Sequence, residues 1–223
     1  MHRHFEQELQ GLKASLIKMG SKVESAIEQA ITSMIAQDKA AAEHIINDDS
    51  TINAMELSIE KGIIDILALQ QPVASDLRFI LAASKINNDL ERIGDHAVNL
   101  AESSIVLMQM NMPLPSLNEI QQMTHVTKRM LSDALDSFIY ADASMGEAVL
   151  KMDDTADSLN KKISQEMMMI MKSNPKTIEQ ALELIRVSRN LERVADLATN
   201  IAEEVVFIAK AQVIKHHAAD VAK

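Results

Sequence analysis

The sequence predicts an all-α protein made of two tandem three-helix bundles that are related by internal duplication. Three observations lead to this fold class. Apolar residues recur at helical spacing along nearly the whole chain, only five Gly and four Pro interrupt the 223 residues, and the second half repeats the pattern of the first. Apolar residues make up 47% of the chain but aromatic residues only 2%, so the core is expected to be aliphatic and rich in Met.

The first bundle is expected to begin with two long helices. Residues 9–35 carry one sustained apolar stripe, which predicts a single helix. Asp38 offers an N-cap for a second helix, whose apolar stripe covers residues 45–67 and stops before Pro72. Pro72 and the cap candidate Ser75 mark the turn into a third helix.

The third helix is expected over residues 76–110. Pro113 and Pro115 break it, because neither proline fits comfortably in a helix interior. The same break is the expected domain boundary. It assigns residues 1–111 to the first repeat and residues 112–223, with a short C-terminal tail, to the second.

Three capping patterns divide the second half into helices four to six. Ser116 with Glu119 forms a capping-box pattern at the start of the fourth helix, and Asp142 is placed to cap the fifth. Thr177 with Gln180 repeats the capping box at the start of the sixth helix, just after a proline. The second half is therefore expected to hold three helices, like the first.

The internal repeat is visible in aligned positions. A shift of 104 residues lays the apolar stripes of the first two helices on those of the fourth and fifth, and a shift of 101 does so for the third and sixth. Residues 90–102 and 191–203 agree at 8 of 13 positions. Generic amphipathicity would repeat the residue class and not this much identity.

Side chains that carry oxygen recur every three or four residues on one side of several helices. At about 100° per residue they form continuous stripes. The candidate metal ligands are Asp49 and Asn53 on the second helix, Glu91, Asp95 and Asn99 on the third, Asp153 and Asp157 on the fifth, and Glu192, Asp196 and Asn200 on the sixth. If neighbouring helices turn these stripes toward each other, carboxylates from both could hold a hard cation.

A plain solvated surface is the alternative for these stripes. On the third helix Ile86, Leu90 and Ile93 lie nearly opposite the acidic residues, and an acidic stripe that faces away from a core is ordinarily hydrated. Like charges four residues apart destabilise an isolated helix, so their placement in both repeats favours a counter-cation. We expect Arg78, Arg92 and Arg193 to orient carboxylates or a neighbouring helix, because Arg92 and Arg193 follow the motif Glu in each repeat.

Composition and motifs exclude several classes of protein. A net charge of −10 argues against nucleic-acid binding, and the absence of Cys excludes disulfides and thiolate metal sites. The N-terminus lacks the apolar core of a signal peptide, and charges interrupt every apolar stretch, so a soluble, cytoplasmic protein is expected. The chain has no Gly-rich phosphate loop, no nucleophile elbow and no His three residues after a Glu, so an enzyme is not expected.

The histidines are not expected to form a metal centre. His96 has no counterpart at the matching position Leu197 and is expected on the surface. His216 and His217 lie in the tail, where a frayed terminus is the expected structure.

Three segments carry a resemblance to a known family: residues 71–78 (QPVASDLR), residues 90–95 (LERIGD) and residues 191–196 (LERVAD). Together with the duplicated length, they make the sequence resemble the PhoU family over nearly the whole chain. These are the accessory proteins of bacterial phosphate-specific transport. The resemblance implies a PhoU-like pair of three-helix bundles whose (Glu or Asp)-x-x-x-Asp motifs bind iron or other metal ions on the bundle surface.

The resemblance also implies which residues hold the metal. The pairs that fit the motif are Glu91 with Asp95, Asp153 with Asp157, and Glu192 with Asp196. Asn53 replaces the expected carboxylate after Asp49, which gives the first repeat a weaker set of ligands. The expected cofactors are divalent or trivalent metal ions, with iron, zinc, manganese and magnesium as candidates.

Family membership would imply a regulator and not an enzyme. Such proteins restrain the phosphate-starvation response when phosphate is plentiful. They are thought to link the ATPase subunit of the phosphate ABC transporter to a phosphate-sensing histidine kinase, to reach the membrane only through these partners, and to form homodimers. Two alternatives stay open: a carboxylate-bundle iron oxidase, against which the missing Glu-x-x-His pair argues, and a metal-buffering protein without a signalling role.

Overall fold

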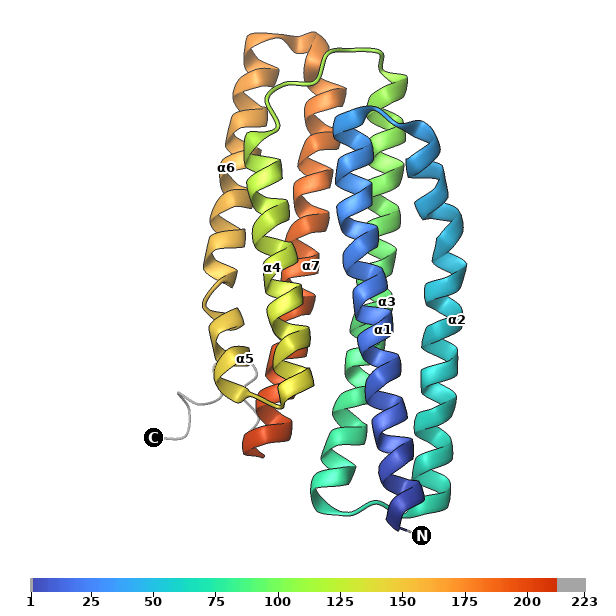
Figure 1. Ribbon diagram of the computed structural model, residues 1–223. Helices are drawn as coiled ribbons and strands as arrows, with labels where there is room; N and C mark the ends of the chain where they lie inside the picture. Colours follow the sequence, from blue (N-terminus) through green and yellow to red (C-terminus); the bar gives the residue numbers. More distant parts are fainter. Residues whose placement is uncertain (1, 212–223) are drawn as a thin grey trace.

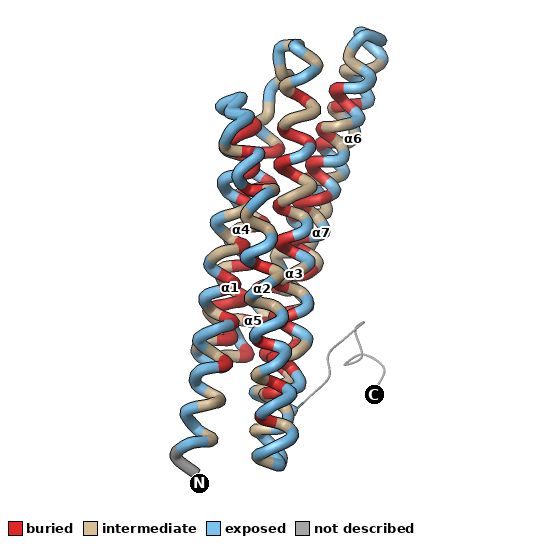
Figure 2. Tube along the Cα trace, turned by 90° about the vertical axis from the view of Figure 1, so that its right-hand side faces the viewer, coloured by how far each residue is buried: buried red, intermediate tan, exposed pale blue. Residues whose placement is uncertain are grey.

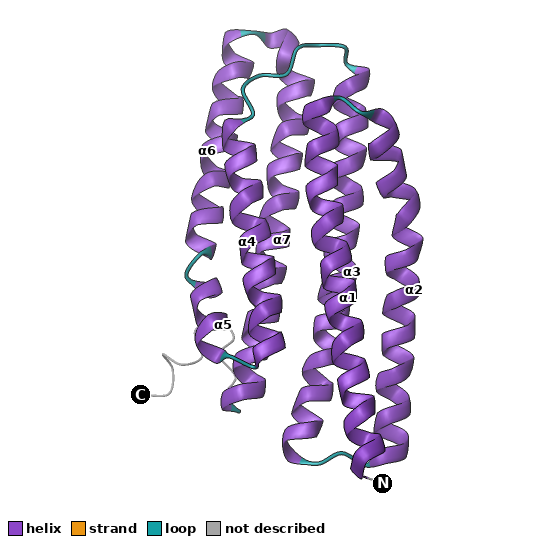
Figure 3. Ribbon diagram, in the orientation of Figure 1, coloured by secondary structure: helices purple, strands orange, loops and turns teal. Residues whose placement is uncertain are grey.

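The computed structural model describes residues 2–211, which form seven α-helices and one short 3-10 turn without any strand (Figure 1; Figure 3). The elements are α1 (His2–Ala36), α2 (Lys39–Gln70), α3 (Ala74–Gln109), α4 (Asn118–Tyr140), α5 (Ala143–Leu150), α6 (Asp153–Ser173), η1 (Pro175–Thr177) and α7 (Ile178–Lys210). His216 and His217 lie outside the described residues. Within residues 2–211, no helix is long and apolar enough to cross a membrane.

The helices form two bundles that lie side by side. α1, α2 and α3 pack against one another, and α4, α7 and the consecutive α5 and α6 form the second bundle (Figure 1). α1 and α3 face α4 and α7, and the contact between α3 and α7 is the most extensive between any two helices. The predicted fold class is therefore confirmed. The domain boundary between residues 111 and 112 stays a prediction.

One continuous apolar core runs through both bundles, and Figure 2 shows its buried positions along the inner faces of the helices. Met19, Leu90 and Met123 are fully buried, as expected for an aliphatic core rich in Met. Each such side chain contributes about 1.5–3 kcal/mol when it leaves water. Phe138 is a buried aromatic residue, and it stacks on Phe79 with ring centroids 5.6 Å apart.

The turn after the first helix is the same in both repeats. Gln37 and Ala141, which match at the shift of 104, both adopt the left-handed conformation, with φ of 54° and 51°. Asp38 and Asp142 follow them, and their carboxylates accept hydrogen bonds from backbone N–H groups at 3.0 and 2.8 Å. Both predicted Asp caps are therefore confirmed.

The predicted fifth helix is wrong, because two helices replace it. α5 ends at Leu150 and α6 begins at Asp153, and in between the Met152 N–H donates to the Val149 carbonyl at 2.9 Å. This bond spans three residues and tightens the chain into a turn. Asp153 and Asp154 then occupy the first turn of α6, where the helix dipole favours negative charge.

The other predicted caps were wrong in their chemistry. α3 begins after Val73 and α4 after Leu117, and neither N-cap makes a side-chain bond. Ser75 lies inside the first turn of α3, and Ser116 lies before the N-cap of α4, so their hydroxyls are not at the capping position. Thr177 does occupy the N-cap of α7, but its hydroxyl makes no capping bond.

Polar contacts join α3 to α7, which run antiparallel. The Lys85 ammonium lies 3.1 Å from both carboxylate oxygens of Glu204, whose side chain is only 2% exposed. Farther along the same interface, His96 Nδ1 and Asn190 Oδ1 are 2.9 Å apart. The expectation that His96 is a surface residue was therefore wrong, because its ring is half-buried between the two repeats.

α1 and α4 also run antiparallel and approach closely. Lys128 pairs with Glu28 at 2.7 Å across this contact. At Gly20, a Cβ atom would lie 2.7 Å from two methyl carbons of Leu135. At this level glycine lets the two repeats approach each other without moving the flexible end of the Leu135 side chain.

Candidate metal site

The first acidic cluster lies where α2 and α3 run side by side, and it consists of Asp49, Asn53, Glu56, Glu91 and Asp95. Four-residue spacing places the members from each helix on one helix face. Two contacts show the antiparallel register: the Asn87 amide donates to the backbone carbonyl of Glu56 at 3.1 Å, and Gly94 lies against Ile52. The two predicted stripes therefore face each other and not only the solvent.

Negative charge in the first acidic cluster is only partly compensated. The Asn53 amide donates to one carboxylate oxygen of Asp49 at 2.7 Å. The other oxygen of Asp49 and the amide oxygen of Asn53 are buried without a hydrogen-bond partner. Partial burial, followed by the charges of Asp95, Glu56 and Asp49, raises the pKa of Glu91 above its ordinary value.

The second acidic cluster occupies the matching place between α6 and α7, and it consists of Asp153, Asp154, Asp157, Glu192 and Asp196. Burial, followed by the charges of Asp196, Asp157, Asp154 and Glu192, raises the pKa of Asp153 to about 6. One oxygen of Asp153 is buried without a partner. This cluster has a carboxylate at residue 157 where the first repeat has an amide, and it carries the larger pKa shift.

Arg92 and Arg193, two of the three arginines that were expected to orient these carboxylates or a neighbouring helix, make different contacts. Arg193 contacts Asp196 at 3.0 Å, one turn along α7, so it touches a member of the second acidic cluster. Arg92 instead pairs with Asp89 at 3.4 Å, on the side of α3 that is away from Asp95. Both guanidinium groups are largely exposed, and such pairs contribute about 0–1 kcal/mol.

Asn99 and Asn200 lie one helical turn beyond Asp95 and Asp196 and are half-buried. The structure therefore places all ten predicted ligands on the two helix pairs that were expected, and it brings the carboxylates of each pair within electrostatic range. Among residues 2–211, no three His, Asp or Glu side chains converge closely enough to hold a metal ion. The site residues stay predictions.

The chemistry of these side chains fits a hard cation. Both clusters offer oxygen ligands, and both contain buried oxygens without partners. Each also has a carboxyl group whose pKa is raised by burial and then by the neighbouring negative charges. A divalent or trivalent ion would supply the missing positive charge. Rotation of the carboxylates around their side-chain bonds would be required to bring three of them onto one ion.

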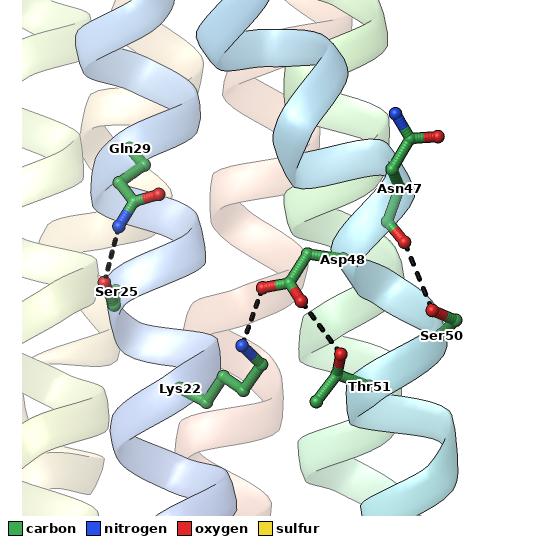
Figure 4. A network of polar contacts seen from close by, with 7 residues as sticks. All are labelled: Lys22, Ser25, Gln29, Asn47, Asp48, Ser50 and Thr51. Atoms are coloured by element: carbon green, nitrogen blue, oxygen red, sulfur yellow. Dashed lines mark hydrogen bonds and ion pairs between the residues drawn. The ribbon is translucent and has the colours of Figure 1, made fainter.

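A cavity that the sequence analysis missed lies beside the first acidic cluster, between α1, α2 and α3. Its volume is about 420 Å³ including its open mouth, and its lining includes Lys22, Gln29, His44 and Asp48. Lys22 Nζ lies 2.6 Å from Asp48, and the Thr51 hydroxyl donates to the other oxygen of the same carboxylate at 2.8 Å (Figure 4). The bond from Lys22, followed by that from Thr51, lowers the pKa of Asp48.

A comparison of the repeats could have found this cavity. At the shift of 104, Lys22 matches Val126, His44 matches Ala148 and Asp48 matches Met152, so three polar positions of the first repeat are apolar in the second. A departure from the repeat was the available signal.

The comparisons with known proteins agree with this architecture. The family model described as "PhoU domain" matches the chain twice, at residues 16–104 and 120–205. The phosphate-specific transport system accessory protein PhoU homolog of Aquifex aeolicus is 38% identical over 210 residues, which cover 94% of this chain and 95% of that protein.

Two crystal structures are similar over nearly the whole chain. PhoU from Pseudomonas aeruginosa has a TM-score of 0.90 and 35% identity, covering 93% of this chain and 100% of that one. The phosphate transport system regulatory protein PhoU from Streptococcus pneumoniae has a TM-score of 0.88 and 30% identity, covering 95% and 99%. The fold, the duplication and these similarities lead to one conclusion: the chain belongs to the PhoU family.

Proposed function

We propose that this chain is a regulatory accessory protein of a phosphate transport system, which restrains the phosphate-starvation response when phosphate is plentiful. The observation that carries the proposal is the similarity to phosphate transport accessory proteins across both repeats and nearly the full length of the relatives. The proposed partners are the ATPase subunit of the phosphate ABC transporter and a phosphate-sensing histidine kinase. A protein that links two others needs binding surfaces and no catalytic centre, which suits a helical platform with exposed charged stripes.

Deletion of the gene tests this proposal. In phosphate-rich medium, the deletion strain should express a phosphate-starvation reporter and take up labelled phosphate at an elevated rate, and the intact gene supplied in trans should restore both. Unchanged reporter expression and uptake would contradict the proposal. Co-purification with each proposed partner, with and without phosphate, then tests the link itself.

We also propose that the two acidic clusters bind divalent or trivalent cations in support of this role. The buried oxygens of Asp49, Asn53 and Asp153 without partners favour this proposal. A bound ion would neutralise the repelling carboxylates and tie α2 to α3 and α6 to α7. Elemental analysis of protein purified without a polyhistidine tag should find a metal ion, and a metal-free preparation that binds none in calorimetry would contradict it.

An iron oxidase is the second candidate, because the clusters offer carboxylates on facing helices. Oxygen consumption with ferrous iron distinguishes the two functions. Turnover would favour the oxidase, and no turnover together with a reporter phenotype would favour the regulator. Metal binding without either result would leave the metal-buffering role.

A further inference from the structure

Large apolar side chains are exposed on the outer surface near the ends of both helical hairpins. Ile64, Leu77 and Leu81 form the first apolar patch, on α2 and α3, with exposed fractions of 57%, 37% and 45%. Met168, Ile178 and Leu182 form the second apolar patch, on α6 and α7, with 48%, 41% and 54%. Figure 1 shows these two hairpin ends at opposite ends of the molecule.

The two patches occupy equivalent positions in the duplication. Ile64 matches Met168 at the shift of 104, whereas Leu77 matches Ile178 and Leu81 matches Leu182 at the shift of 101. All six side chains lie outside the buried core, so core packing does not explain an apolar residue at each position. The recurrence of exposed apolar residues at equivalent positions makes these patches candidate surfaces for another molecule.

Each patch lies on the same face as an acidic cluster. Leu81, Asn88 and Asp95 follow one another at seven-residue intervals along α3, so they share one helix face. Leu182 and Asp196 have the same separation on α7. Fourteen residues of helix span about 21 Å, which is the distance from patch to cluster along either helix.

The neighbouring helix adds to each patch at the same level. In the antiparallel pair α2 and α3, the Asn87 amide reaches the Glu56 carbonyl and Ile52 lies against Gly94. This register places Ile64 beside Leu81, so the first apolar patch spans both helices. The bond from the Ser188 hydroxyl to Asn160 sets a similar register for α6 and α7.

We propose that each repeat docks a basic amphipathic helix of a partner protein, with apolar side chains on the patch and Lys or Arg side chains over the acidic cluster. The charges select this occupant. A second copy of this chain would bring like charge to the clusters, and an anionic lipid surface would be repelled by them. A helix that covers both features needs about 14–18 residues.

This inference rests on the proposed adaptor function and adds a prediction of its own. One chain should bind two such helices, because the patch and the cluster occur twice. Its test uses purified protein and chelator, so its failure would leave the phosphate phenotype and the metal measurements as they stand. The two proposals share the acidic clusters, where a bound metal ion would compete with the basic side chains of the helix, and the chelator removes this competition from the test.

The probe is a synthetic amphipathic helix of Leu and Lys, about 18 residues long, titrated into the full chain by calorimetry at low salt. The parent protein should bind two peptides. Leu77→Ser with Leu81→Ser, or Ile178→Ser with Leu182→Ser, should remove one site each. The four substitutions together should weaken peptide binding at least about tenfold. Leu81→Lys changes a single exposed position, and it should abolish the first site because the new Lys repels the Lys side chains of the peptide.

Ile35→Ser and Tyr140→Ser provide the matched controls, because both residues are exposed and apolar but lie outside the patches. They should bind two peptides, and all variants should keep the parent melting temperature. Equal binding of a scrambled peptide with the same composition would overturn the proposal. So would peptide binding that the patch substitutions leave unchanged, self-association of the chain that they abolish, or attachment of the parent protein to anionic vesicles that depends on the patches.

Discussion

The two acidic clusters come from one duplicated framework but differ in charge and in their surroundings. In the first, the amide of Asn53 bonds to Asp49, and the cavity with the Lys22 and Asp48 pair lies next to it. In the second, Asp157 replaces the amide, and the break between α5 and α6 places Asp153 in a first helical turn. Two equivalent helix pairs therefore hold different numbers of carboxylates, and in the second cluster burial, followed by the neighbouring charges, raises the pKa of Asp153 to about 6.

The largest expected effect separates the clusters by their metal dependence. Glu192→Gln with Asp196→Asn should abolish a metal-induced rise in melting temperature at the second cluster. At a hundredfold excess over Kd, a ligand specific for the native state adds about 2.7 kcal/mol. Calorimetry at low salt without chelator measures the rise. Glu91→Gln with Asp95→Asn should remove less, and an equal loss from both pairs would show that the clusters are equivalent.

A carboxylate at position 53 would make the first cluster resemble the second and test whether this charge causes their difference. Asn53→Asp removes the amide hydrogen bond to Asp49 and adds a like charge. Without metal, the variant should lose about 1–2 kcal/mol of unfolding free energy, and with metal it should bind more tightly than the parent. Denaturant unfolding with and without metal gives both values. Asn53→Ser is the control, since it removes the bond without adding charge.

A smaller effect should appear in the pH dependence of Asp153. Its folded pKa of about 6 lies above the ordinary value of 3.8, so it contributes full stability below about pH 4 and loses it as pH rises through 6. Asp153→Asn removes this loss, so the metal-free variant should be more stable than the parent above pH 6. A shift of this size would give about 3 kcal/mol at full burial, and solvent screening reduces it to about 1 kcal/mol.

The difference between variant and parent should disappear below pH 4, where the Asp153 carboxyl is protonated in both the folded and the unfolded chain. Urea unfolding at several pH values in chelator provides the measurement. A constant difference across the whole pH range would assign the effect to packing and not to charge. Asp65→Asn is the matched control, because Asp65 is an exposed acidic residue on α2 that belongs to neither cluster.

The smallest effect concerns the cavity beside the first cluster. Replacing Lys22 and Asp48 by their counterparts Val and Met should change the unfolding free energy by about 0.5 kcal/mol or less, because the ion pair is partly exposed. Hydrogen bonding lowers the pKa of Asp48, so this contribution is present above its unfolded pKa and is lost as pH falls. A double-mutant cycle at two pH values isolates it, and a coupling that grows toward low pH would contradict the assignment.

Helical periodicity was sufficient to predict the fold class, because long stripes such as residues 9–35 leave no alternative to a helix. It could not show the break at Met152, where no Gly or Pro interrupts the pattern and a local three-residue bond makes the turn. The Asp caps were predictable because an Asp directly before a helix can accept hydrogen bonds from the free backbone N–H groups of the first turn. Ser75 and Ser116 were not, since the helix starts depend on packing beyond the turn.

For the candidate site, residue spacing predicted which residues share a helix face. The recurrence of the acidic faces in both repeats favoured a bound cation. Residue spacing did not give the distances across helices, which decide that Asn53 bonds to Asp49 while Asp153 keeps an oxygen without a partner. His96 was misplaced for the same reason, because its partner Asn190 is on a helix 94 residues away. The residue pattern along one helix does not predict its contacts with a helix far away in the sequence.

The polar contacts between α3 and α7 also matter while the protein is being synthesised. The first repeat leaves the ribosome before α7 has been synthesised. During that time, water contacts the face of α3 that α7 later covers. Lys85 and His96 lie on this face, and water solvates them until Glu204 and Asn190 arrive. Two polar side chains on this face make the half-made chain less prone to aggregate than a wholly apolar face would. The contacts that join the finished halves therefore also protect the unfinished one.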